Sequence, residues 1–239
     1  MEPSTSTLSP ASLDSALDGE PPVDTWADPG PVTPIELGAH LAARMCHDYI
    51  SPAGAIMSGL DLLEDPSAQD MREEAMTLIA SSARKLVDLL SFDRVALGAS
   101  AAAETFGVDQ LETLANGVFS HARAQLVWSV APRTLPKPAA RALLNLVQIG
   151  LGALPTGGVA TLTVVEEDGG YTLSIDCAGA RARLRPAVID GLDGRRLQEG
   201  LAGLWVQAYY LRQLVDCAQG TLEHAVFEER VLVTVKLPA

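Results

Sequence analysis

Hydrophobic side chains recur every three or four residues through the first stretch that predicts ordered structure, which is the spacing of one face of an α-helix. The apolar positions of this stretch are Ala42, Met45, Tyr49, Ala53, Ile56, Leu60 and Leu63. The opposite face is polar or small, at Glu36, His40, Arg44, His47, Ser51, Gly54, Ser58 and Asp61. A capping box with proline at the first helical position begins the stretch at Thr33, and Asp65-Pro66-Ser67 predicts a turn after it. We therefore predict one long amphipathic helix between Thr33 and Asp65.

A second helix is predicted from about Ser67 to Leu97, with Gly98 as its stop. Its apolar seam consists of Met71, Ala75, Leu78, Ile79, Leu86, Leu89 and Leu90. With roughly 30 residues, each of the two helices is about 45 Å long. A single hairpin of this kind cannot cover its own apolar face, whereas two hairpins can pack as a four-helix bundle. We therefore expect a homodimer.

After a short linker at residues 99–104, the pattern changes to mixed helices and strands over residues 105–239. Helices are predicted at 109–123, 138–154 and 203–217, and strands at 125–130, 159–166, 171–177, 221–227 and 230–237. Helices that cover one face of a small, mostly antiparallel sheet form an α/β sandwich. The predicted fold class is α+β and multi-domain, with a helical hairpin at residues 33–98 followed by this sandwich.

Charge and composition exclude several classes of partner. The chain of 239 residues has 30 acidic and 17 basic residues and a net charge of −13, which disfavours nucleic acid and anionic membranes. Residues 1–32 contain no Lys or Arg and are rich in Pro, Ser, Thr and acidic residues, so we expect a disordered tail and no secretory signal. No apolar run approaches the ~18 residues that span a bilayer. The three cysteines, Cys46, Cys177 and Cys217, form no CxxC pair, and we expect a cytoplasmic protein.

The strongest candidate for chemistry is His47, on the polar side of the first predicted helix. Neutral imidazole is a nucleophile near neutral pH, and Asp48 beside it could fix the tautomer that attacks. Arg44 and Ser51 lie one turn before and one turn after, where they could contact a phosphoryl group or a partner. Pro52 removes the backbone hydrogen bond to Asp48 and should bend the helix there. The other histidines lack this context and are interpreted as ordinary surface or partly buried residues: His40, His121 and His224.

Residues 33–98 resemble the dimerisation and histidine-phosphotransfer domain of sensor histidine kinases. The motif of that domain is His, an acidic residue, two variable positions, a small polar residue and Pro, which here runs from His47 to Pro52. The stretch Ile-Met-Ser-Gly-Leu-Asp-Leu-Leu-Glu-Asp-Pro at 56–66 is more specifically similar to the ChpT family, the alphaproteobacterial cell-cycle histidine phosphotransferases. Similarity to this family extends through 153–158 and 182–186, and so covers nearly everything after the tail.

The sequence departs from the pattern of a kinase ATP-binding domain at three places. Kinases bind Mg²⁺ through the second asparagine of Asn-x-x-x-Asn, but here Asn145 is followed by Ile149, which cannot ligate a hard cation. Asp176 keeps the aspartate of Asp-x-Gly-x-Gly without its glycine spacing, and we interpret it as a remnant of the fold. The stretch before the last helix keeps two glycines but carries Trp205, which is too bulky for a loop that must wrap phosphates. We therefore expect a degenerate ATPase-like domain that binds no ATP.

The resemblance implies a histidine phosphotransferase in a phosphorelay. In it, His47 attacks a phosphoaspartate on the receiver domain of a hybrid sensor histidine kinase and passes the phosphoryl group to an aspartate of an acceptor. The implied acceptors are response-regulator receivers of the CtrA and CpdR types. We expect the partner to dock on Arg44, Ile50 and Ser51, with further contact from the C-terminal domain. The chain itself should bind no cofactor, because the receivers supply Mg²⁺.

Two other functions are open at this point. The first is an ATP-dependent sensor histidine kinase, which predicts nucleotide binding and is disfavoured by Ile149 and Trp205. The second is a non-catalytic dimeric adaptor with a vestigial histidine, which predicts that His47→Ala leaves signalling by the partner unchanged.

Overall fold

The computed structural model describes residues 31–98, 103–167, 169–197 and 202–238. Contacts between Cα atoms divide the chain into two units, Met1–Val32 and Thr33–Ala239. The tail predicted at residues 1–32 and the linker predicted at 99–104 lie largely outside the described residues, so both stay predictions.

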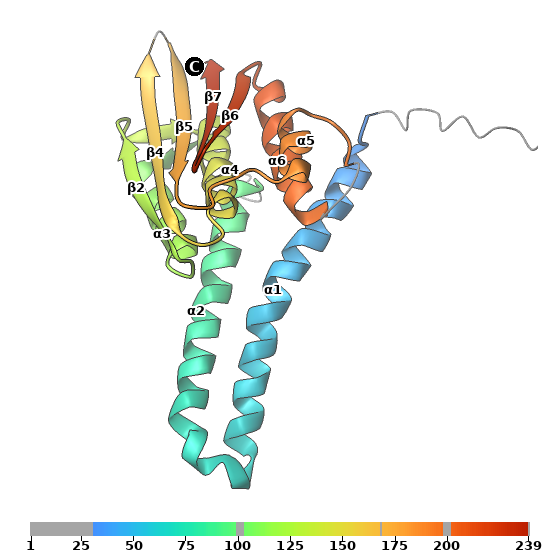
Figure 1. The fold of residues 1–239 in the computed structure, drawn as a ribbon, viewed down its shortest axis with the longest axis vertical. Helices are drawn as coiled ribbons and strands as arrows, with labels where there is room; N and C mark the ends of the chain where they lie inside the picture. The colour runs from blue at the N-terminus through green and yellow to red at the C-terminus, as the bar shows by residue number, and fades with distance from the viewer. Residues whose placement is uncertain (1–30, 99–102, 168, 198–201, 239) are drawn as a thin grey trace, which may run out of the picture. The chain divides into compact units, whose positions relative to one another are not determined.

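A helical hairpin of α1 (Pro34–Glu64) and α2 (Arg72–Ala96) begins the larger unit (Figure 1). The predicted capping box is confirmed at the start of α1. There the Thr33 side chain accepts a hydrogen bond from the Glu36 N–H at 3.2 Å, and the Glu36 carboxylate accepts one from the Thr33 N–H at 3.2 Å. These two bonds satisfy backbone donors that have no partner within the helix.

The second helix begins later than predicted. Residues Pro66–Met71 form a 3₁₀ segment, η2, in which Ala68 has non-helical angles (φ −108°, ψ 25°). The α-helix therefore starts at Arg72 rather than near Ser67. Gly98 follows α2 with a φ of +86°, a left-handed conformation that favours glycine. The predicted stop is thus confirmed.

Two close contacts join the helices of the hairpin. Gly59 lies so near α2 that a Cβ atom at this position would be 2.6 Å from the Ile79 side chain and 3.1 Å from the Ala75 carbonyl oxygen. Elsewhere along the pair, the Tyr49 hydroxyl donates a hydrogen bond of 2.7 Å to the Asp93 carboxylate. Gly59 permits the two helices to pack closely. Tyr49 provides a hydrogen-bond donor to the Asp93 carboxylate, which lies between the helices.

The hairpin leaves one apolar stripe uncovered. Its exposed members are Leu60, Met76, Val87 and Leu90. Gly59 and Ala75 face each other, so positions can be counted from them at about 3.6 residues per turn. All four side chains then project to the same side of the hairpin, and His47 projects to the opposite side. We call these four residues the apolar stripe.

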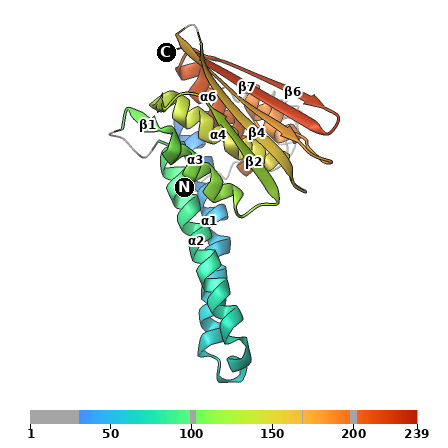
Figure 2. The same ribbon diagram turned by 90° about the vertical axis from the view of Figure 1, so that its left-hand side faces the viewer.

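A five-stranded sheet with the strand order β2-β4-β5-β7-β6 dominates the rest of the unit. Its strands are β2 (Ala124–Val130), β4 (Gly158–Glu167), β5 (Gly170–Ala178), β6 (Thr221–Phe227) and β7 (Arg230–Pro238). Strand β2 pairs with β4 in parallel, and the other three pairs are antiparallel. The helices that cover one face are α3 (Val108–Phe119), α4 (Lys137–Ala153) and α6 (Ala202–Cys217) (Figure 2). The predicted α+β fold with a mostly antiparallel sheet is confirmed.

Three short elements were not predicted. Strands β1 (Thr105–Gly107) and β3 (Thr134–Pro136) form a separate two-stranded sheet, and α5 (Pro186–Leu192) is a helix of seven residues. Three residues are too few to show alternation, and two turns are too few to show a helical period.

One core serves the sheet, its covering helices and the end of the hairpin. Alternate residues of β4, namely Ala160, Leu162 and Val164, are fully buried under the helices. Phe92 and Val95, near the end of α2, belong to the same hydrophobic cluster. The end of the hairpin is therefore packed into the sandwich. Over the described ranges, no helix has the length and apolarity needed to cross a bilayer.

Gly191→Ala should destabilise the protein by about 1–3 kcal/mol, as overpacking of a tight contact does. A Cβ atom at Gly191 in α5 would lie 2.6 Å from the carbonyl oxygen of Trp205 and 2.8 Å from the nitrogen of Tyr209, and these are backbone atoms that cannot rotate away. Gly38→Ala, in α1 with open space around it, is the matched control and should be neutral or stabilising by up to about 1 kcal/mol. Urea denaturation measures both, and equal midpoints for the two variants would contradict the prediction.

Asp93→Asn should raise the free energy of unfolding near neutral pH. Burial raises the pKa of Asp93 more than the hydrogen bond from Tyr49 lowers it. Above the ordinary carboxyl pKa the folded protein therefore binds more protons at this site than the unfolded chain, and stability falls as pH rises through the raised pKa. Asparagine removes the charge and keeps an acceptor for Tyr49.

The gain from Asp93→Asn should accordingly shrink as the pH is lowered through the raised pKa of Asp93, which urea denaturation between about pH 8 and about pH 4 measures. Asp61→Asn, on the exposed face of α1, is the control and should show no such trend. A gain independent of pH would contradict this account of Asp93.

Candidate functional site

Helix α1 presents His47 to solvent with one ring nitrogen engaged. The His47 side chain is 84% exposed, whereas that of Asp48 is 22% exposed. The His47 Nδ1 atom lies 3.1 Å from Asp48 Oδ1. An ionised carboxylate can only accept a hydrogen bond, so this geometry assigns the ring hydrogen to Nδ1. The Nε2 atom then carries the free lone pair.

Arg44 holds the other oxygen of the Asp48 carboxylate. Its Nε atom donates to Asp48 Oδ2 at 2.5 Å, and its Nη1 atom donates to the carbonyl oxygen of Gly203 at 2.7 Å. Gly203 lies in the first turn of α6. A chain of hydrogen bonds thus runs from the imidazole of His47 through Asp48 and Arg44 to the backbone of α6.

Two further contacts fix α1 against the start of α6. The carboxylate of Glu36 accepts hydrogen bonds from both terminal nitrogens of Arg196, at 2.8 and 2.9 Å, and this pair lowers the pKa of Glu36. The ring of His40 meets the buried Trp205 edge to face, with 5.4 Å between ring centroids. Trp205 in turn donates to the carbonyl oxygen of Arg195 at 2.8 Å. The polar face of α1 is therefore partly covered by the C-terminal sandwich.

His47 stands between two pockets that the hairpin and the sandwich form together. The α6-side pocket, of about 440 Å³, is lined by His40, Ala43, Arg44, His47, Asp48, Arg185, Ala202, Gly203 and Leu204. The α2-side pocket, of about 330 Å³, is lined by Arg44, His47, Asp48, Ser51, Lys85, Leu89, Val118, His121, Ala122, Gln148 and Leu151. Both flank the exposed imidazole, so a partner that reaches His47 also meets the sandwich.

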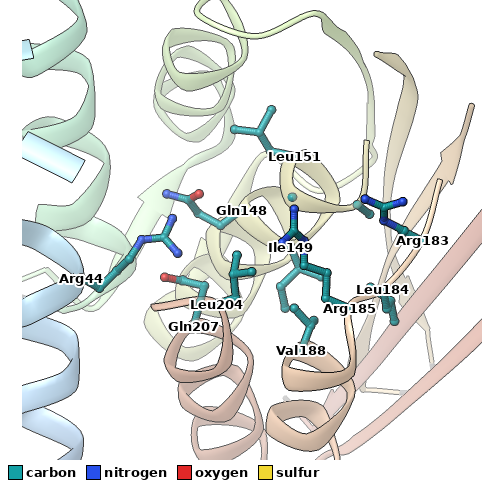
Figure 3. A pocket seen from close by; sticks show the side chains of 12 residues that line it. Arg44, Gln148, Ile149, Leu151, Arg183, Leu184, Arg185, Val188, Leu204 and Gln207 are labelled. Atoms are coloured by element: carbon teal, nitrogen blue, oxygen red, sulfur yellow. The ribbon is translucent and has the colours of Figure 1, made fainter. Parts of the chain in front are cut away.

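A third pocket lies beside α4, and it is lined by Ile149, the residue that stands in place of the second asparagine of the kinase pattern (Figure 3). Its volume is about 160 Å³. Figure 3 shows Arg44 reaching it from α1 and Gln148 and Ile149 from α4, while Arg183 and Arg185 come from the loop before α5. We call it the inner pocket.

The two polar residues of the kinase pattern that this chain keeps are engaged within the protein. Asn145 is fully buried, and its amide nitrogen donates to the carbonyl oxygens of Ala96 at 3.1 Å and Arg141 at 2.7 Å, while its oxygen accepts a hydrogen bond from Gln207. Asp176 forms a bidentate pair with Arg230 of the neighbouring strand, at 2.8 and 2.6 Å.

The predicted partner-binding residues lie near His47, and the structure adds other residues to the pockets around it. Of the residues predicted to meet a partner, Ile50 is 70% exposed and Ser51 lines the α2-side pocket. His121 was interpreted as an ordinary surface residue, but it lines the same pocket and hydrogen-bonds to Asp88 at 2.7 Å. No role is predicted for Lys85, Arg183 or Arg185, although both arginines lie in the stretch 182–186 that resembles the ChpT family. Within the described residues, no group of three or more His, Cys, Asp or Glu side chains could hold a metal ion.

Comparisons with known proteins agree on one family. Residues 108–230 match the family model of the histidine phosphotransferase C-terminal domain. Over 205 residues the chain is 35% identical to the protein phosphotransferase ChpT of Brucella abortus (strain 2308), which covers 85% of this chain and 97% of that protein. A solved 1.7 Å structure of a bacterial phosphotransferase is 32% identical and superposes with a TM-score of 0.77, over 87% of this chain and 98% of the other. The chain therefore belongs to the ChpT-like family of histidine phosphotransferases.

Proposed function

We propose that this protein relays a phosphoryl group between receiver domains through a phosphohistidine at His47. The observation that carries the proposal is the state of the imidazole: the side chain is 84% exposed, and its Nδ1 atom is held by Asp48. The nucleophilic Nε2 atom is thus presented to solvent in one tautomer, which is what attack on a partner requires.

The bonds and charges of the proposed transfer balance with His47 and Asp48 as the only participating groups of this chain. The Nε2 lone pair attacks the phosphorus of a phosphoaspartate, the N–P bond forms, and the acyl P–O bond breaks to release the aspartate carboxylate. The ring keeps its hydrogen at Nδ1 and becomes positively charged, and the carboxylate of Asp48 stabilises that charge. In the second step, a carboxylate oxygen of the acceptor attacks the same phosphorus, and the N–P bond breaks.

The proposed partners are those that the resemblance to the family suggests. The donor in this proposal is the phosphorylated receiver of a hybrid sensor histidine kinase, and the acceptors are receivers of the CtrA and CpdR types. The receivers supply Mg²⁺, and the exchange takes place in the cytoplasm. The partner contacts Ile50 and Ser51 on the exposed face of α1.

The proposed relay uses no ATP. Ile149 stands where kinases place the Mg²⁺-binding asparagine, and the amide of Asn145 is occupied by three hydrogen bonds within the protein. The carboxylate of Asp176 is paired with Arg230. The inner pocket, at about 160 Å³, is smaller than the ~300–1,000 Å³ of typical small-molecule sites. These features all disfavour the ATP-dependent kinase.

The proposed assembly is a homodimer that buries the apolar stripe in a four-helix bundle. All four members of the stripe are at least 40% exposed in the single chain, and they lie on the side of the hairpin opposite His47. Pairing two stripes would remove this surface from water and leave both imidazoles accessible.

His47→Ala should abolish acceptance of label from a hybrid-kinase receiver that carries phosphate label on its aspartate, because the nucleophile is removed. Wild type should acquire acid-labile, base-stable label without ATP. His224→Ala is the matched control, since His224 pairs with Asp193 outside the site and its loss should leave labelling intact.

The outcome separates the candidate functions. Label from γ-labelled ATP on wild type would indicate a kinase instead. A His47→Ala variant that still supports signalling by the partner would indicate the adaptor.

Met76→Glu should weaken the dimer at least tenfold, because it places two carboxylates in an apolar interface; burying an unpaired charge costs several kcal/mol, and tenfold corresponds to about 1.4 kcal/mol. Met57→Glu is the matched control: Met57 is 58% exposed and Met76 53%, but Met57 projects away from α2 and is not a member of the stripe. Sedimentation over a range of concentrations measures both. A dimer that survives Met76→Glu, or wild type that is monomeric, would refute this interface.

A further inference from the structure

The α2-side pocket beside His47 gathers polar side chains from four separate parts of the chain. They are Ser51 of α1, Lys85 of α2, His121 just after α3, and Gln148 of α4. Each of these side chains can donate a hydrogen bond. Because they are distant in the sequence, only the packing of the hairpin against the sandwich brings them to the imidazole. The pocket therefore presents a set of donors next to the nucleophile.

Most of these donors are not used within the protein. Arg44 and Lys85 are the arginine and lysine of the pocket lining, and Arg44 is paired with Asp48, which is the carboxylate of that lining. Lys85 is half-buried, and across the described residues it forms no ion pair. In the same part of the chain, neither Ser51 nor Gln148 makes a side-chain hydrogen bond. An uncompensated ammonium group beside two free donors favours an anion.

The sandwich side of this pocket is held in place against α2. The His121 Nε2 atom lies 2.7 Å from the carboxylate of Asp88 in α2. A Cβ atom at Gly117 of α3 would lie 3.3 Å from the carboxylate carbon of Asp88, so α3 packs closely on this residue. Figure 3 shows the Gln148 side chain extending from α4 toward Arg44 of α1. The donors are thus positioned before any ligand arrives.

We propose that the α2-side pocket binds the phosphoryl group that His47 carries, and that Lys85 and Gln148 are catalytic residues that donate hydrogen bonds to its oxygens. The inference rests on the proposed relay. In phosphoryl transfer, negative charge is spread over the three equatorial oxygens of the transition state, and preorganised donors stabilise it. No proton moves to or from Lys85: the N–P bond at His47 forms and breaks as in the relay.

The phosphoryl group is the anion that chemistry itself brings to this pocket. It is bonded to the imidazole of His47, which lines the pocket, and a volume of about 330 Å³ holds it together with water. The chain has a net charge of −13, which opposes the addition of further negative charge. The ammonium group of Lys85 offsets that repulsion at the one place where the charge is added.

A small phosphodonor tests this role without a protein partner. Phosphoramidate phosphorylates histidine directly, with formation of the N–P bond at His47 and release of ammonia. Lys85→Gln should slow this reaction at least about tenfold, and should slow transfer from a phosphorylated receiver by a similar factor, because a hydrogen bond to a charged group is lost. Lys236→Gln is the matched control and should stay within about twofold of wild type, since Lys236 is exposed on β7 and lines none of the pockets beside His47.

The amide of Gln148 is tested in the same way. Gln148→Ala should slow the reaction with phosphoramidate at least about threefold, because a neutral donor contributes less than a charged one. Gln125→Ala, at an exposed position of β2, is its control and should react at the wild-type rate. Thermal melts of each variant establish that the fold is retained.

Two further measurements separate contact with the phosphoryl group from a structural role. Lys85→Arg keeps the positive charge and should recover part of the rate that Lys85→Gln loses. The ³¹P resonance of phosphorylated His47 should shift in Lys85→Gln and stay at its wild-type position in Lys236→Gln.

Several results would overturn the phosphoryl pocket while leaving the relay intact. A wild-type rate with phosphoramidate in Lys85→Gln would do so, as would an unchanged ³¹P resonance or an equal loss in Lys236→Gln. A loss with the receiver alone would make Lys85 a contact for the partner and also refute the proposal. Wild type that accepts no label from any phosphorylated receiver would instead refute the relay, and the phosphoramidate rates would still decide the role of the pocket.

Discussion

Arg44 is bound to Asp48 on its own helix and to the backbone of α6, and the geometry around His47 depends on this pair of hydrogen bonds. The first bond sets the position of the Asp48 carboxylate, which in turn holds the Nδ1 atom of the imidazole. The second bond, to the Gly203 carbonyl, can form only because the sandwich lies against α1. The ion pair between Glu36 and Arg196 keeps the two together nearby. The orientation of an exposed side chain is thereby tied to the packing of the whole unit.

Asn145 and Asp176 both bond within the protein, the first in the core and the second at the surface of the sheet. Asn145 joins the end of α2 to α4 and α6 through its amide, and Asp176 joins β5 to β7 through Arg230. A buried amide with every bond made stabilises a fold, since leaving any of them unmade would carry a desolvation cost. The buried amide of Asn145 therefore stabilises the sandwich, and the arginines that line the inner pocket from the sandwich side come from the loop before α5.

The sequence predicted most of the regular structure because apolar residues recur at helical or strand spacing along each long element. The spacing between Ala42 and Leu63 predicts α1, and alternation along residues 159–166 predicts β4. Element ends depend on single residues, and the non-helical angles of Ala68 explain why α2 begins later than expected. Elements as short as α5 bury too few residues to show a period.

Only the part of the candidate site that consists of neighbouring residues in the sequence could be predicted. His47 and Asp48 are consecutive residues of one sequence motif, and the structure shows the hydrogen bond between them. Arg44 and Gly203 are 159 positions apart, and Asp176 and Arg230 are 54 apart, so only folding brings these pairs together. A single sequence contains no pattern that couples such distant positions.

Gly203 adds a consequence for how this protein can change over evolutionary time. A Cβ atom at this position would lie 3.2 Å from Cδ of Arg44, tighter than most contacts of its kind, so a larger residue there would require the Arg44 side chain to shift by a few tenths of an ångström. Substitutions at Gly203 in α6 are therefore constrained by the need to keep His47 of α1 in position. Selection for the function of His47 would then also act on Gly203, which is linked to it only through Arg44 and Asp48.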